Sequence, residues 1–278
     1  MRRTRRDDGP VAQDIYRFDR EEFFADYWRY GESGDAEHAT FCGMNRSGKT
    51  TLAFQCLEHS TRTDPEMGKD DSRVALVLVM KPQDRTPELW GRKLGYKRID
   101  QWPPPMMRAE RKYNVRKAPP GYLVWPKLGN LRTDNDRLRK LFYTVLAESY
   151  AQAARGKRAQ ERIIFADEVI GLQRISNGDY PIKGALDDLY ERGAGMGVGL
   201  WAALQKPFNA PTNAYENSIH IFIWRTNDRR NLKRYEEIGG IDADALDGIV
   251  RTLRGRDCLY INRALNIDEA EFYVIGED

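Results

Sequence analysis

The chain has 278 residues, with 45 lysines and arginines against 42 aspartates and glutamates and a formal net charge of +3. This length allows one large α/β domain or two small ones, and the near-balanced charge does not by itself indicate a nucleic-acid partner. Three scattered cysteines are too few for a disulfide framework or a zinc site, and the longest apolar run, Val74 to Met80, is too short to span a bilayer. We therefore expect a soluble, cytoplasmic protein without membrane insertion.

Residues 1–35 are expected to form a basic and aromatic arm ahead of the main domain, which we place at residues 36–278. Four of the first six residues are arginines. Without a following apolar stretch, this start is not a secretory signal. Residues 20–28 (REEFFADYW) then predict a short amphipathic helix with an aromatic face.

Residues 43–50 read Gly-Met-Asn-Arg-Ser-Gly-Lys-Thr, the complete pattern G-x-x-x-x-G-K-[ST] of a phosphate-binding loop. A short buried strand at 38–42 leads into the loop, and a helix is expected from about Lys49. In such a loop, backbone N–H groups cradle phosphates, Lys49 reaches the β- and γ-phosphates, and the Thr50 hydroxyl ligates Mg²⁺. The residues predicted to bind ATP are Gly43, Met44, Asn45, Arg46, Ser47, Gly48, Lys49, Thr50 and Thr51.

The apolar run at 74–80 predicts a strand buried on both faces, as a parallel sheet requires. Residues 84–132 break this pattern with two proline runs and several tryptophans, and we interpret them as an insertion with its own local packing. A long helix is expected at 134–155, with Thr133 or Asp134 as its N-terminal cap.

Residues 163–166 form an apolar strand that ends in two adjacent acids, Asp167 and Glu168. In a nucleotide hydrolase the first acid holds Mg²⁺ together with Thr50, and the second deprotonates the attacking water. The adjacent glutamate favours an ATPase that turns over, rather than a GTPase switch or a kinase. The alternative is a charged turn after a buried strand.

A helix is expected at 182–192, and a glycine-rich turn then leads into a buried strand at 198–204 and Gln205. We expect the Gln205 amide beside the γ-phosphate, where it could distinguish ATP from ADP; the alternative is that it simply caps the strand. Further strands are predicted at 218–224, 258–261 and 271–274. The alternation of strands and helices predicts a parallel sheet with the phosphate loop at its carboxyl edge.

Four segments together resemble the FtsK/HerA superfamily of hexameric DNA-pumping ATPases: GMNRSGKT at 43–50, RIIFADE at 162–168, ERGAGMGVGLWAALQKP at 191–207 and NSIHIFIWRT at 217–226. The resemblance implies an α/β fold, a RecA-like P-loop ATPase core with a mainly parallel central sheet flanked by helices. It also implies a glutamine at the strand end, as Gln205 supplies, and an arginine that acts on a neighbouring subunit's ATP. Arg192 or Arg225 would be that arginine. The chain departs from the family at Arg46, whose side chain is larger than those common inside the loop.

The resemblance implies ATP hydrolysis coupled to DNA movement, with Lys49, Glu168, Gln205, Arg192 and Arg225 as catalytic residues. The short segment ahead of the loop favours a compact ATPase that packages a viral genome. The expected partners are double-stranded DNA without sequence preference, further copies in a hexameric ring, and a capsid vertex or portal protein. The alternatives are a plasmid or conjugative DNA pump of the same superfamily and an ATP-binding scaffold that does not move DNA.

Overall fold

A computed structural model of the chain describes residues 15–31, 36–61, 73–104, 119–155, 161–206, 208, 210–236, 238, 242–264 and 271–276. The strands are β1 Arg17–Phe18, β2 Ala39–Cys42, β3 Val74–Leu78, β4 Lys97–Ile99, β5 Gly121–Val124, β6 Arg162–Ala166, β7 Val198–Leu204, β8 His220–Trp224, β9 Cys258–Asn262 and β10 Glu271–Ile275. The α-helices are α1 Arg20–Glu22, α2 Lys49–Ser60, α3 Arg85–Lys93, α5 Leu131–Ala154, α6 Val169–Ile175, α7 Ile182–Arg192, α8 Thr212–Glu216, α9 Leu232–Tyr235 and α10 Ala243–Thr252. The arginine-rich first residues and Pro207 lie outside the described residues.

The described strands form one ten-stranded sheet in the order β1-β10-β9-β8-β2-β7-β6-β3-β5-β4. Strand β9 runs antiparallel to both of its neighbours, and all other pairs are parallel. The predicted α/β fold with a mainly parallel sheet is confirmed.

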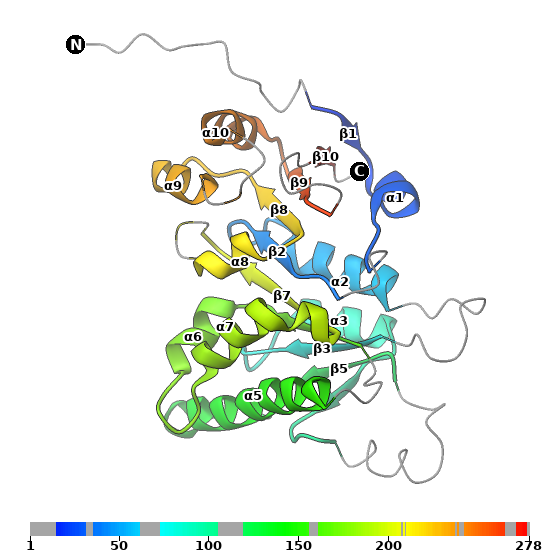
Figure 1. Ribbon diagram of the computed structural model, residues 1–278. Helices are drawn as coiled ribbons and strands as arrows, with labels where there is room; N and C mark the ends of the chain where they lie inside the picture. Colours follow the sequence, from blue (N-terminus) through cyan, green and yellow to red (C-terminus); the bar gives the residue numbers. More distant parts are fainter. Residues whose placement is uncertain are drawn as a thin grey trace.

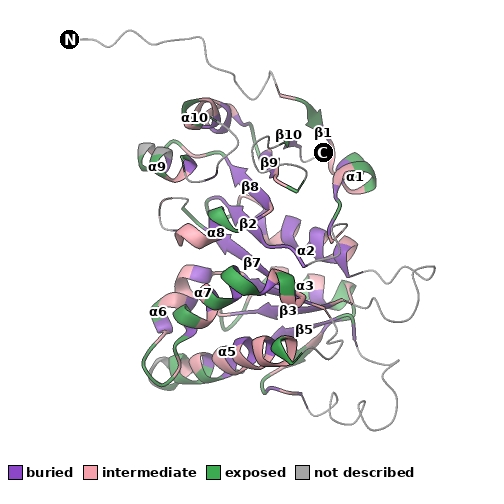
Figure 2. Cartoon of the chain, viewed as in Figure 1, coloured by how far each residue is buried: buried purple, intermediate pink, exposed green. Residues whose placement is uncertain are grey.

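Helices cover both faces of this sheet (Figure 1). Helices α5, α6, α7 and α8 pack on one face, and α2 and α3 pack on the other. Successive side chains of a strand point to opposite faces, so strand residues divide between two apolar clusters. Leu76 joins the cluster under α5, whereas Val77 joins the cluster under α2. The central strands are therefore buried throughout (Figure 2), as the continuous apolar run at 74–80 predicted.

Strand order determines which residues meet at the carboxyl edge of the sheet. Strand β7 lies between β2 and β6 and pairs in parallel with both. The phosphate loop follows β2, the acid pair follows β6, and Gln205 follows β7. Three segments that are far apart in the sequence therefore converge at adjacent strand ends.

The segment expected as an N-terminal arm belongs to this domain where it is described. Strand β1 pairs with β10, and helix α1 continues into a π-helical turn, Phe23–Tyr27, so the predicted helix is present. The Trp28 side chain is only 5% exposed, and its Nε1 donates to Ser60 Oγ on α2 at 3.1 Å. Residues 15–31 thus pack on the core rather than extend from it.

Residues 84–132 also correct an expectation. Instead of packing locally, their described parts supply α3, β4 and β5, and β5 pairs with β3 to extend the central sheet. Residues 105–118 lie outside the described residues. Helix α5 begins at Leu131, earlier than predicted, because Asp134 does not cap it: the Asp134 carboxylate accepts the N–H groups of Gly129 and Asn130 at 2.9 Å and so stabilises the preceding turn.

Among the described residues, no helix combines the length and the apolar character needed to cross a membrane.

Candidate nucleotide-binding and catalytic site

The phosphate loop has a backbone that requires glycine at two places. Gly48 has φ +98°, in the left-handed region that side chains disfavour, and it immediately precedes α2. At Gly43, a Cβ atom would lie 2.7 Å from Trp224 Cβ and 2.9 Å from Ser47 Oγ. Among the described residues, Arg46 is the non-glycine residue with positive φ, at +65°. The loop is thus tightly folded against the end of β8.

This loop has the donor groups that bind a polyphosphate. The first N–H groups of a helix have no intrahelical partners, so the start of α2 presents N–H donors to an anion. Lys49 is 8% exposed, and its Nζ donates to the Met44 carbonyl at 2.9 Å. Burial lowers the pKa of Lys49, while Asp167 and Glu168 oppose this shift. Ser47 Oγ is buried without a hydrogen-bond partner. An anionic ligand would satisfy these groups.

The oxygen ligands suited to Mg²⁺ meet at the start of α2. Thr50 Oγ1 donates to Asp167 Oδ1 at 2.7 Å. The Asp167 side chain is 7% exposed, and Lys81 Nζ lies 3.9 Å from its Oδ2. Burial raises the pKa of Asp167, and the Thr50 hydrogen bond and the Lys81 charge partly offset this. No cluster of three or more His, Cys, Asp or Glu side chains suited to a metal occurs in the described ranges. A hydroxyl and one carboxylate nevertheless fit Mg²⁺, which usually shares its coordination with substrate phosphates and water.

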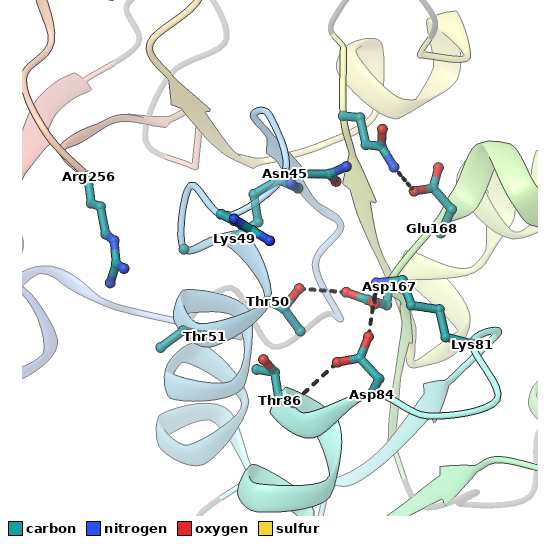
Figure 3. A pocket seen from close by; sticks show the side chains of 13 residues that line it. Asn45, Lys49, Thr50, Thr51, Lys81, Asp84, Thr86, Asp167, Glu168 and Arg256 are labelled. Atoms are coloured by element: carbon teal, nitrogen blue, oxygen red, sulfur yellow. Dashed lines mark hydrogen bonds and ion pairs between the residues drawn. The ribbon is translucent and has the colours of Figure 1, made fainter.

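The second acid of the pair contacts the strand-end glutamine. Gln205 Nε2 donates to Glu168 Oε2 at 2.7 Å (Figure 3). The two side chains follow adjacent strands, β7 and β6, and both lie at the surface of the cleft. This contact joins the residue expected to activate water to the residue expected to sense the γ-phosphate.

These groups line one cleft of about 340 Å³, shown in Figure 3. Its lining residues are Asn45, Arg46, Gly48, Lys49, Thr50, Thr51, Lys81, Asp84, Thr86, Asp167, Glu168, Gln205 and Arg256. An adjoining cleft of about 510 Å³ shares Asn45, Arg46 and Gln205 and is also lined by Met44, Ser47 and Arg225. The structure therefore brings together every predicted binding residue except Gly43, which lies at the base of the loop.

One predicted site residue lies far from the cleft. Arg192 ends α7 and precedes β7, so it lies at the opposite, amino-terminal edge of the sheet, where its Nη1 donates to Tyr150 Oη at 3.3 Å. It does not reach the cleft of its own chain.

Sequence reasoning missed two residues that line the cleft, Lys81 and Asp84. Lys81 Nζ donates to Asp84 Oδ2 at 2.9 Å. Their signal was their position just after the buried strand at 74–80.

Solved structures of known proteins share the fold of this chain. No protein-family model and no curated protein sequence matches the chain. Among solved structures, the genome packaging NTPase B204 of Sulfolobus turreted icosahedral virus 2, in complex with sulfate, aligns with TM-score 0.52 and 14% identity over 87% of this chain and 96% of that chain. VirB4 of Thermoanaerobacter pseudethanolicus aligns with TM-score 0.57 and 13% identity over 91% and 92%. B204 in complex with ATP-gammaS aligns with TM-score 0.51 and 14% identity over 85% and 96%.

The chain has the fold of these neighbours, a mostly parallel sheet flanked by helices, with a phosphate loop at its carboxyl edge. The resemblance inferred from the four sequence segments is thus confirmed at the level of the fold.

Proposed function

We propose that this chain is an ATP-driven translocase of double-stranded DNA that packages a viral genome into a preformed capsid. One observation carries the proposal: Gln205 and Glu168 are hydrogen-bonded at 2.7 Å beside the phosphate loop. Gln205 ends a strand and contacts the catalytic acid, so a change at the γ-phosphate can shift the residues that follow Gln205 in the chain. The similarity to the fold of the genome packaging NTPase B204 supports a viral genome as the molecule that is moved.

The chemistry is phosphoryl transfer to water. Lys49 and the N–H groups at the start of α2 bind the phosphates, and Glu168 accepts a proton from the attacking water. Mg²⁺, held by Thr50 and Asp167, would neutralise charge on the phosphates when bound. Arg192 lies outside the cleft of its own chain, and its proposed action is on the ATP of a neighbouring subunit in a hexameric ring; Arg225 is the other candidate. The ring would dock on a capsid vertex or portal protein.

The segment after Gln205 provides a route from ATP to DNA. The Phe208 ring lies 5.7 Å from Lys206 Nζ and 4.0 Å from Arg230 Cζ. The Phe208 N–H is bonded to Asn231 Oδ1 at 3.4 Å. We propose that a shift of Gln205 moves Phe208, further along the chain, and with it Arg230 and the basic segment at residues 225–234. Lysine and arginine side chains there would grip DNA phosphates without reading bases.

The test is the ATPase rate with and without double-stranded DNA at several salt concentrations. We expect DNA to stimulate the wild type, with a stimulation that falls steeply as salt rises. Gln205→Ala should keep the KM for ATP nearly unchanged and lose the stimulation. Gln101→Ala, which truncates an exposed glutamine outside the cleft, is the matched control. If DNA has no effect on the wild type at low salt, the translocase proposal fails in favour of an ATP-binding scaffold.

A further inference from the structure

Two arginines among the described residues, Arg46 and Arg256, line the nucleotide cleft, and only Arg46 belongs to the phosphate loop. Arg256 belongs to the turn between α10 and β9, and it lines the same cleft as Lys49 and Thr51. Figure 3 shows it on the opposite side of the phosphate loop from Glu168. Its place in the cleft follows from the fold.

The turn that carries Arg256 is held against the phosphate loop. Trp224 Nε1 donates to the Arg256 carbonyl at 3.2 Å. Trp224 is 2% exposed, and its Cβ lies so close to Gly43 that only glycine fits there. The Asp257 N–H closes the turn by donating to the Arg254 carbonyl at 2.9 Å. Arg256 is therefore held beside the loop, although its side chain is exposed to solvent.

The two sides of the loop differ in what they can bind. Thr50, Asp167 and Glu168 lie on one side, where the metal and the γ-phosphate belong. Because the phosphate chain of a nucleotide runs along the loop, its nucleoside must leave on the other side. Figure 3 places Thr51 and Arg256 there.

We propose that Arg256 forms a nucleoside subsite, in which its guanidinium contacts the ribose and packs on the face of the base. A planar guanidinium stacks on aromatic rings and presents several N–H donors, so it suits this ligand better than an ammonium group. Every base has such a face, so this contact does not by itself select adenine. This inference rests on the proposed function, because it assumes that a nucleoside triphosphate occupies the cleft.

The experiment compares the binding of ATPγS with that of inorganic tripolyphosphate by titration calorimetry, with Mg²⁺ and without DNA. The wild type should bind ATPγS more tightly than tripolyphosphate. Arg256→Ala should weaken ATPγS binding about 10-fold and leave tripolyphosphate binding unchanged. Arg254→Ala removes the same charge from the same turn but lies outside the cleft, so it should change neither affinity. Arg256→Lys keeps the charge but should also lose ATPγS affinity, because the planar group is gone.

Two results would overturn the subsite. Equal weakening of both ligands by Arg256→Ala would make the residue a phosphate ligand, and unchanged ATPγS binding would give it no role. A wild type that binds neither ligand would instead refute the nucleotide site, and with it the proposed function. The two failures are therefore distinguishable.

Discussion

Truncation of Trp28 tests whether the N-terminal segment belongs to the cooperative core. The ring of Trp28 lies 5.8 Å from that of Trp201 and 4.6 Å from that of His220, on β7 and β8. Its indole N–H donates to Ser60 Oγ, which itself bonds to the Cys56 carbonyl at 2.8 Å. The side chain thus links residues 15–31 to the central strands and to α2.

The expected loss of stability follows from these contacts. Replacing a buried tryptophan by alanine costs about 3–5 kcal/mol. The lost hydrogen bond is part of this cost at about 1 kcal/mol, and Ser60 keeps its second partner, so no orphaned group adds a large penalty. We expect Trp28→Ala to lower the free energy of unfolding by about 4 kcal/mol. For 278 residues, an unfolding entropy of about 2.1 cal/mol/K per residue converts this to a fall in Tm of roughly 7 °C.

The assay is urea unfolding followed by circular dichroism, with thermal melts in parallel. Tyr16→Ala is the matched control on the same segment, because Tyr16 is 71% exposed and its truncation should change stability by only about 0.5 kcal/mol. A Trp28→Ala variant within about 1 kcal/mol of the wild type would refute the reasoning. It would mean that residues 15–31 detach before the core unfolds.

Two further predictions concern the acid pair. Glu168→Gln should bind ATPγS normally but hydrolyse ATP about 10²- to 10⁴-fold more slowly, because the amide cannot accept the proton from water. Single-turnover rates measure this change. If the variant hydrolyses ATP at the wild-type rate, another residue is the general base. Burial raises the pKa of Asp167, so the folded chain loses stability as pH rises from the unfolded value of about 3.9 through the raised folded value. Asp167→Asn should therefore unfold at higher urea than the wild type at pH 7, and this advantage should shrink towards pH 4. A less stable variant at pH 7 would contradict the sign.

The central strands and the phosphate loop were predictable because their signals are local. A continuous apolar run at 74–80 is sufficient to indicate a strand buried on both faces. The pattern at 43–50 itself places a glycine at position 48, where the backbone has a positive φ. The acid pair and Gln205 were also placed at strand ends by short apolar runs that precede them. Their mutual contact, however, depends on β7 lying between β2 and β6.

The features that sequence reasoning missed depend on distant pairing. Strand β1 finds β10 some 250 residues away, and β5 joins β3 across a proline-rich stretch, so neither pairing has a local signal. Arg256 reaches the cleft because Trp224 holds its turn, which no spacing encodes. Helix α10 did have a local signal: Asp242 caps it through the Ala245 N–H, and apolar residues follow at helical spacing.

The position of β7 also has a mechanical consequence. Val198–Ala202 pair in parallel with β6, and Trp201–Leu204 pair in parallel with β2, so the strand is hydrogen-bonded on both sides. A pull on Lys206 along the strand axis loads these bonds in shear, so that many must break together before the strand slides. A pull across the sheet would instead open them one after another. The strand that carries Gln205 can thus bear tension as a stiff rod, and the loops at its end will deform before it does.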